Sequence, residues 1–423
     1  MALPQAKLDQ LSARIAGLHF PATGWQGKAR GEALERLGAM GLPGKRDEYW
    51  RYTDPTALTA PETKAVEGRG EAAFESIDAV KLVFVDGVFD AAASDDPALA
   101  GVEITRLAEV ADIHWAGDLY GQLEAAGQTP VQRPLAAIGS AFATDGVLIR
   151  ATAAAGRPVA LVYRSESYSS DVILHHVVKL EEGAELTLLE SGDAAARLLT
   201  VMEVDVAKDA RFHHVRSQGR TPERLVATHI FARIAEGALF KSFTVAANGV
   251  LTRNEAVLDI VGDDAVAHVA GVAVGDGRDF LHDDTVFITH GAERCESRQV
   301  FKKVLKNGAT GVFQGKILVK PGAQKTDGYQ ISQSLLLDGD SQFLAKPELE
   351  IYADDVKCSH GSTSGAIDDT ALFYLRSRGV PEKAAQSLLV LAFLAEALAE
   401  IEDEAIAEDL RARLEGWLDR HDG

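Results

Sequence analysis

The residue types with the clearest chemistry lie near the C-terminal end of the chain, where one serine separates Cys358 from His360. A soft thiolate and an imidazole two residues apart could both reach one metal ion or one partner surface. An apolar, strand-like run, Leu349 to Tyr352, comes shortly before them. The segment from Pro347 to Gly379 is therefore either a working site or only a tight corner of the fold.

The residues alone leave both interpretations open. A free cysteine is commonly buried and inert, so Cys358 and His360 also suit a small buried thiol and a hydrogen-bonded imidazole. Two protein ligands are too few for a closed metal site, which usually takes four. If the pair binds iron or a cluster, the other ligands must come from a second chain or from sulfide.

The other cysteine and the paired histidines are weaker candidates for metal ligands. Cys295 lies between a Gly-Ala turn and a strand, and we expect a structural role for it. His175-His176 and His213-His214 stand near turns. Adjacent residues on a strand point to opposite faces, so neither pair can chelate one metal through both rings. We expect these histidines to be surface or tunnel-lining residues.

The sequence lacks the common nucleotide and hydrolase motifs. Gly41 to Lys45 and Gly311 to Lys316 end in Gly-Lys but lack the spacing and the following Ser/Thr of a phosphate-binding loop. GxGxxG after a strand, GxSxG and HExxH are also missing. Any ATP hydrolysis linked to this protein is therefore expected in a partner.

Composition predicts a soluble, cytoplasmic, globular protein. The chain has 423 residues, 46% of them hydrophobic, which is enough for two or three structural parts. A formal charge of −20 argues against nucleic acid or an anionic membrane as a partner. Two cysteines make no disulfide framework, and no window reads as a signal peptide or a membrane span.

Residues 1–130 predict an N-terminal, mostly helical domain. A second helix, roughly Arg30 to Ala39, ends at Gly41. Lys81 to Asp90 reads as a β-hairpin around an Asp-Gly turn, near residues 81–90. The first helix is indicated by apolar residues at helical spacing, which are Leu8, Leu11, Ile15 and Leu18.

Residues 131–365 predict a β-solenoid, or β-helix, core. Short alternating strands have one face in and one face out. A near-constant period under thirty residues is typical of a solenoid, in which each repeat must stack on its neighbours. The strands are separated by Gly-Ala or Asp-Ala turns at steps of 26, 28, 27 and 27 residues, beginning at Gly183, Asp209, Gly237, Asp264 and Gly291.

Residues 366–423 predict a C-terminal helical domain. Pro381 to Asp422 carries a broad apolar stripe, then an acidic stretch, then a second amphipathic face. These helices could pack on one another as a hairpin, or they could dock another protein.

The segment Pro347 to Gly379 resembles the C-terminal signature of the SufB/SufD family, the scaffold subunits of the SUF iron–sulfur cluster assembly machinery. The resemblance continues through His290 to Gln330, with weaker similarity at Arg46 to Pro55 and at Ala141 to Arg150. These blocks span most of the chain, and the last hundred or so residues are the most specific.

The resemblance implies a right-handed parallel β-helix flanked by helical parts, and a non-catalytic scaffold subunit of the SufBCD complex. The β-helix would pair with SufB, and the C-terminal helices would hold the ATPase SufC. A transient iron–sulfur cluster, or iron, would form at the interface with SufB. His360 would be the ligand from this side and Cys358 its neighbour.

Family membership also implies points that the residues leave undefined. SufB-type chains are longer and richer in cysteine, with an N-terminal cluster motif that is missing here, so this chain resembles the partner of SufB. Flavin is associated with the assembled complex, and no residue here identifies a site for it. The isolated chain could form a homodimer.

Two other functions remain open from the sequence. Right-handed β-helices also host polysaccharide-active enzymes, in which Asp354, Asp355 and Lys357 could act along a groove. Such enzymes are usually secreted, and this chain shows no signal peptide. The third possibility is a purely structural module without a metal role.

Overall fold

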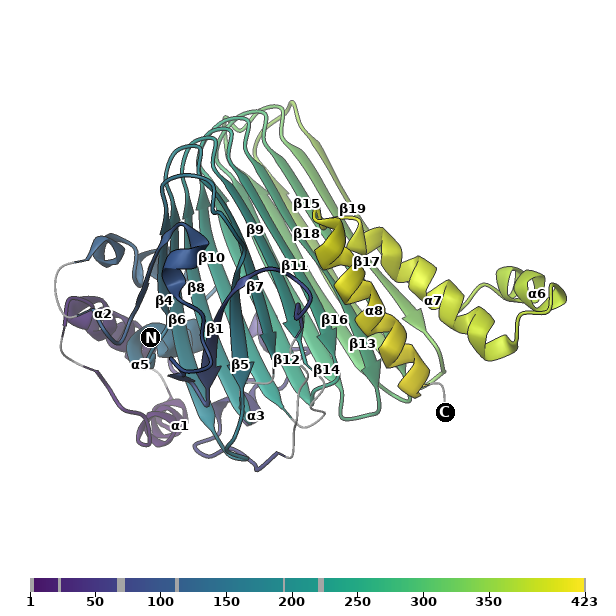
Figure 1. The fold of residues 1–423 in the computed structure, drawn as a ribbon, viewed down its shortest axis with the longest axis horizontal. Helices are drawn as coiled ribbons and strands as arrows, with labels where there is room; N and C mark the ends of the chain where they lie inside the picture. The colour runs from purple at the N-terminus through teal and green to yellow at the C-terminus, as the bar shows by residue number, and fades with distance from the viewer. Residues whose placement is uncertain are drawn as a thin grey trace.

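The computed structural model describes residues 4–21, 24–66, 73–110, 114–192, 195–219 and 224–421. At its centre is a β-solenoid, in which successive strands alternate between two stacked sheets (Figure 1). Neighbouring strands in each sheet pair in parallel, apart from the antiparallel pairs β1–β2 and β3–β4. Each coil therefore lies directly on the coil before it.

The two sheets hold the following strands. The 10-stranded sheet contains β1 (Val80–Val85), β2 (Val88–Phe89), β5 (Val159–Arg164), β7 (Glu185–Gly192), β9 (Arg211–Gln218), β11 (Leu239–Ala247), β13 (Val266–Asp276), β15 (Glu296–Lys306), β17 (Asp327–Leu336) and β19 (Lys357–Gly365). The 9-stranded sheet contains β3 (Glu103–Arg106), β4 (Val147–Ala151), β6 (Asp171–Leu180), β8 (Arg197–Val206), β10 (Leu225–Ile234), β12 (Leu251–Ile260), β14 (Leu281–His290), β16 (Thr310–Val319) and β18 (Gln342–Ile351).

Helices from both ends of the chain cover the outer faces of the sheets (Figure 1). The N-terminal helices pack on the 9-stranded sheet and are α1 (Gln5–Ile15), α2 (Gly27–Met40), α3 (Thr56–Thr59), α4 (Gln122–Ala126) and α5 (Pro134–Phe142). Short 3-10 turns lie at η1 (Glu48–Trp50), η2 (Pro97–Ala100) and η3 (Trp115–Asp118). The C-terminal helices are α6 (Asp369–Ser377), α7 (Glu382–Leu398) and α8 (Glu404–His421), of which α7 and α8 pack on the 10-stranded sheet.

The prediction of a mainly β protein with a solenoid core and helices at both ends is confirmed. Right-handedness and the division into domains at residues 130 and 365 stay predictions. The N-terminal third also adds strands to both sheets, because β1 and β2 extend one sheet and β3 extends the other. Val85 and Val88 pair across the Asp86-Gly87 turn.

Turn residues explain the spacing seen in the sequence. Gly183, Asp209, Gly237 and Asp264 have φ between 57° and 69°, a left-handed conformation that glycine adopts freely and aspartate tolerates. An alanine follows each of them and is fully buried. At the next turn the positive φ falls on Arg294 instead of Gly291, three residues later.

Cys295 therefore takes the place that alanine holds in the earlier coils. It is buried, and its Sγ lies 3.3 Å from the carbonyl oxygens of Gly262 and Glu293. Burial raises the pKa of this thiol above its ordinary value. A small, buried, protonated side chain continues the stack of alanines, which is a structural role.

The lumen between the two sheets is packed with apolar side chains. Phe212 and Phe240 lie on adjacent strands with ring centroids 5.5 Å apart, and both are fully buried. Inward-facing residues of successive coils belong to one continuous core that extends from Val80 to Phe313. The solenoid is thus held by apolar burial as well as by its backbone ladders.

A series of buried polar side chains runs through the same lumen. The hydroxyl of Tyr163 donates to Glu190 at 3.2 Å, and Glu190 pairs with His214 and Arg216 at 2.9 Å. Burial lowers the pKa of three other histidines to about 4: His176 and His290 in the lumen, and His229 on the covered outer face of β10. These rings are therefore neutral at pH 7.

We expect Phe212→Ala to lower the free energy of unfolding by about 3–5 kcal/mol, because it leaves a cavity in a fully packed lumen. The urea midpoint of the far-ultraviolet circular dichroism signal measures this change. Phe373→Ala is the matched control, since 73% of that side chain is exposed, and it should change stability by less than about 0.5 kcal/mol. Equal losses from the two variants would contradict the assignment of the core.

We expect stability to fall as the pH drops from about 6.5 to about 4. The unfolded chain binds protons on these histidines before the folded chain does, so each one contributes about 1.4 kcal/mol per pH unit in this window. His290→Gln should reduce that slope by one proton, measured by urea unfolding at several pH values. Ser297→Ala removes the hydrogen-bond partner of His290 but no titrating group, so its slope should stay as in the wild type. A His290→Gln slope that matches the wild type would refute the prediction.

Candidate functional site

The last coil of the solenoid has two open strand edges. β18 and β19 are the terminal strands of their sheets, and no described strand pairs with their outer edges. Such edges present unpaired N–H and C=O groups to any strand that approaches. Tyr352, directly after β18, is largely exposed. The outer edges of β18 and β19 are therefore available for pairing with a strand of another chain.

Cys358 and His360 both lie on β19, at this open end. Alternation along the strand puts them on one face. The same face carries Ser362 and Ser364, whose hydroxyls lie 3.1 Å and 2.8 Å from those of serines 332 and 334 in the coil below. Serines 332 and 334 are buried in the lumen, so Cys358 and His360 continue the lumen wall to its mouth.

The two side chains differ in environment. Cys358 is partly buried and packs beside Ile317, Val319 and Ala323, whereas His360 is exposed. Burial raises the pKa of the Cys358 thiol above its ordinary value, so it is protonated at neutral pH. A metal ion that binds there must displace that proton.

The described chain does not complete a metal site around this pair. Among the residues that the structure describes, no group of three or more His, Cys, Asp or Glu side chains is arranged to hold a metal ion. Cys358 and His360 thus offer two donors at an edge. The remaining ligands of any bound metal must come from outside the described residues.

The paired histidines divide between the two faces of their strands. His175 is fully buried, stacks on Tyr120 at 4.2 Å and lies 2.8 Å from the carboxylate of Glu203. His176 and His214 face the lumen. The tunnel-lining prediction is therefore right for these two rings, whereas the outward-facing rings of His175 and His213 are covered by segments from distant parts of the chain.

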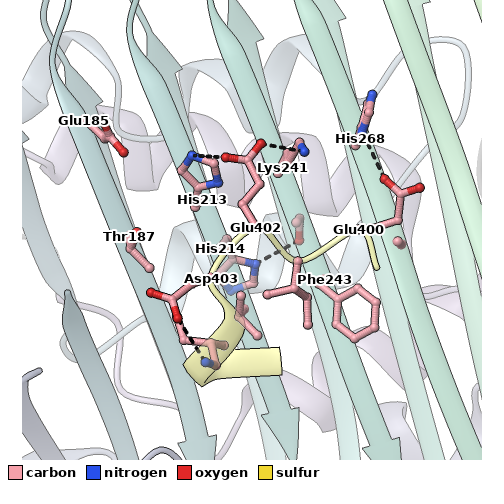
Figure 2. A pocket seen from close by; sticks show the side chains of 15 residues that line it. Glu185, Thr187, His213, His214, Lys241, Phe243, His268, Glu400, Glu402 and Asp403 are labelled. Carbon is pink, nitrogen blue, oxygen red and sulfur yellow. Dashed lines mark hydrogen bonds and ion pairs between the residues drawn. The ribbon is translucent and has the colours of Figure 1, made fainter. Parts of the chain in front are cut away.

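A second cluster lies under the link between α7 and α8. A cavity of about 240 Å³ separates this link from the outer face of β7, β9, β11 and β13 (Figure 2). Glu400 pairs with His268 at 3.0 Å, and Glu402 pairs with Lys241 at 2.6 Å and with His213 at 3.7 Å. These ion pairs fasten the C-terminal helices to the sheet. The sequence shows Glu400 and Glu402 as part of an acidic stretch, but it does not reveal which basic residues they pair with.

α6 stands away from the body of the molecule, at the far end of α7 (Figure 1). None of its residues is buried. Phe373 is 73% exposed and Tyr374 is 54% exposed, with the guanidinium of Arg378 4.4 Å from the Tyr374 ring. Leu388 on α7 is also exposed. We call these four residues the α6 patch.

Two general findings concern the class of protein. No helix within the described ranges is both long enough and apolar enough to cross a membrane. The family model "SUF system FeS cluster assembly, SufBD core domain" matches residues 163–393, which extend from β5 into α7. This match includes the last coil with Cys358 and His360.

Two known proteins match most of the chain, and a third matches part of it. The iron–sulfur cluster assembly protein SufD of Escherichia coli is 29% identical over 90% of each chain. A SufBD family protein of Synechocystis is 27% identical over 87% of this chain and 86% of its own. Bacillus subtilis SufD is 30% identical over 39% of this chain and 37% of its own. With more than half of its length matched by the family model, the chain belongs to the SufBD family of the SUF iron–sulfur cluster assembly system, as a SufD-type member.

Proposed function

We propose that this chain is a non-catalytic scaffold subunit whose last coil supplies one half of an iron–sulfur assembly site. A SufB chain supplies the other half at the open edges of β18 and β19. The observation that carries the proposal is the incomplete donor set: Cys358 and His360 share one face of an edge strand, without a third ligand among the described residues.

Strand addition is the simplest way to complete this site. Parallel coils need a partner for every edge, and an incoming strand would satisfy the free backbone groups of β19. It would also place its own side chains about 4.8 Å from Cys358 and His360, within reach of a shared metal ion. The cluster is cargo in this scheme, and a half-exposed site lets it leave.

The α6 patch supports a second contact, with the ATPase SufC. Exposed aromatic rings beside an arginine are the side chains that most often dominate binding energy at interfaces. ATP hydrolysis then belongs to SufC, because the sequence lacks a phosphate-binding loop.

Movement of SufC can reach the solenoid through α7. The ammonium of Lys302 on β15 pairs with Glu396 of α7 and lies 4.4 Å from the Phe393 ring. Glu400, at the end of α7, holds His268 of β13. A force applied at α6 would therefore act on β13 and β15, two coils and more below the open end.

A polysaccharide-active enzyme is less well supported. Asp354 accepts a hydrogen bond of 2.7 Å from Gln324, and Asp355 pairs with Lys325. Both carboxylates thus bind the preceding turn and do not face a groove as an acid–base pair. The cytoplasmic location stays a prediction, and the proposal does not depend on flavin.

We expect His360→Ala to leave the complex with SufB and SufC assembled but to lower its iron and sulfide content at least tenfold after anaerobic reconstitution, because one ligand is lost. The measurement is metal and sulfide analysis of the co-purified complex. His19→Ala removes an exposed histidine at the other end of the molecule and should load normally. Normal loading of His360→Ala would show that the last coil is architectural.

We expect the double change Phe373→Ser and Tyr374→Ser to weaken binding of purified SufC by about tenfold or more, since it removes both rings of the α6 patch. Biolayer interferometry measures the affinity. Tyr168→Ser is the control, because this ring is 60% exposed in the connection between β5 and β6. Unchanged affinity of the double variant would place the SufC contact elsewhere.

A further inference from the structure

His360 stands at the end of a column of amide side chains inside the lumen. The register places it over Gln330 of β17, and Gln330 over Gln299 of β15. Both glutamines are fully buried. In the next coil down, the same position holds Val269, which belongs to the apolar core. The lumen wall thus changes from apolar to amide two coils before His360.

The hydrogen bonds of this column run in one direction. Nε2 of Gln299 donates to the backbone carbonyl of Lys316 at 3.4 Å, so its Oε1 is left to face Gln330. Nε2 of Gln330 donates to that oxygen at 2.8 Å. A stacked amide that gives its N–H₂ to one neighbour presents its carbonyl to the neighbour on the other side.

The side-chain carbonyl of Gln330 is without a partner among the described residues. Its Oε1 is buried and accepts no hydrogen bond from the described residues. A buried acceptor without a donor is costly, about 1–3 kcal/mol, and such groups call for an explanation. The next side chain along the column is His360, and an imidazole N–H is a suitable donor.

Gly315 leaves the space that this column occupies. It lies on β16, across the lumen from the glutamines. A Cβ at this position would overlap Nε2 of Gln330 and lie 2.7 Å from Oε1 of Gln299. Its φ is not in the left-handed region, so the backbone alone does not require glycine here. Glycine is required at this position because the two glutamine amides fill the space that a Cβ would occupy.

The two side chains are not bonded in this conformation, but the register places the imidazole next to the free carbonyl oxygen of Gln330. We propose that Gln330 is a positioning residue for His360: the imidazole turns toward this oxygen, donates its N–H to it, and is thereby held in one ring tautomer. This inference rests on the proposed role of His360 as a ligand. The ring nitrogen nearer Gln330 carries the proton, and the lone pair of the other nitrogen faces the open edge. Outer-shell acceptors of this kind hold metal-binding histidines in their coordinating orientation.

The tautomer can be read directly on the isolated, iron-free chain. In protein with ¹⁵N-labelled histidine, long-range ¹H–¹⁵N correlation spectra distinguish the two ring nitrogens, and His360→Ala identifies the signals of His360. We expect a single tautomer in the wild type and a mixture in Gln330→Ala. Gln330→Met fills the same space without an acceptor and should also give a mixture.

Two further variants separate positioning from a general effect on folding. Gln333→Ala changes the same residue type on the other face of β17 and should leave the His360 tautomer unchanged. Gly315→Ala should displace the Gln330 amide and give a mixture with Gln330 itself intact. The same tautomer ratio in the wild type and in Gln330→Ala would overturn the inference.

Loading of the complex then tests the consequence for iron. Gln330→Ala should reduce retained iron about 10- to 100-fold, and Gln330→Met should reduce it by a similar factor. If the tautomer shifts but His360→Ala loads normally, the proposed function fails while the positioning of His360 by Gln330 stands. If the tautomer does not shift, the inference fails whatever the iron content.

Discussion

In-register stacking of coils is the constraint on which the rest of this structure depends. Every strand of the core hydrogen-bonds to the strand of the preceding coil, and each side chain lies over its counterpart one coil earlier. Columns of like residues follow from this geometry, as with the buried alanines that Cys295 continues. A stack of this kind cannot satisfy the edges of its own last coil.

The candidate site is a product of that unsatisfied end. Cys358 and His360 occupy positions that in earlier coils would be enclosed, and only the end of the stack exposes His360. The lumen wall also becomes polar below His360, because Gln299 and Gln330 replace the apolar Val269 in the column beneath the imidazole. The C-terminal helices provide a second surface, which Glu396 and Glu400 tie to β15 and β13. The solenoid thus carries a ligand pair at its open end and an attachment point on its outer face.

The sequence predicted the architecture well because its signals are local. Alternating strands, turn residues and amphipathic stripes act within one coil or one helix, so a solenoid core with helices at both ends could be read from them. The Cys358–His360 pair was visible for the same reason. The turn at Gly291 was misplaced, since the Gly-Ala pair resembles the earlier turns but the left-handed residue is Arg294.

Contacts between distant segments could not be predicted. The sequence could not show which segment would cover each outward-facing histidine: Tyr120 stacks on His175, and Glu402 reaches His213 from the far end of the chain. The column beneath His360 depends on coil lengths of 30 and 31 residues, read from the pairs Gln330–His360 and Gln299–Gln330. An error of one or two residues in the expected coil length changes which residues are predicted to stack on one another.

The central claim is that the open edge of the last coil is an interface that a partner chain completes. Amide hydrogen exchange of this chain, alone and with SufB, tests it most directly. The account predicts that SufB slows exchange in β19 and β18, whose outer edges no described strand covers, and leaves the strands of the earlier coils unchanged. Slower exchange confined to α6–α8, with β18 and β19 unaffected, would contradict it.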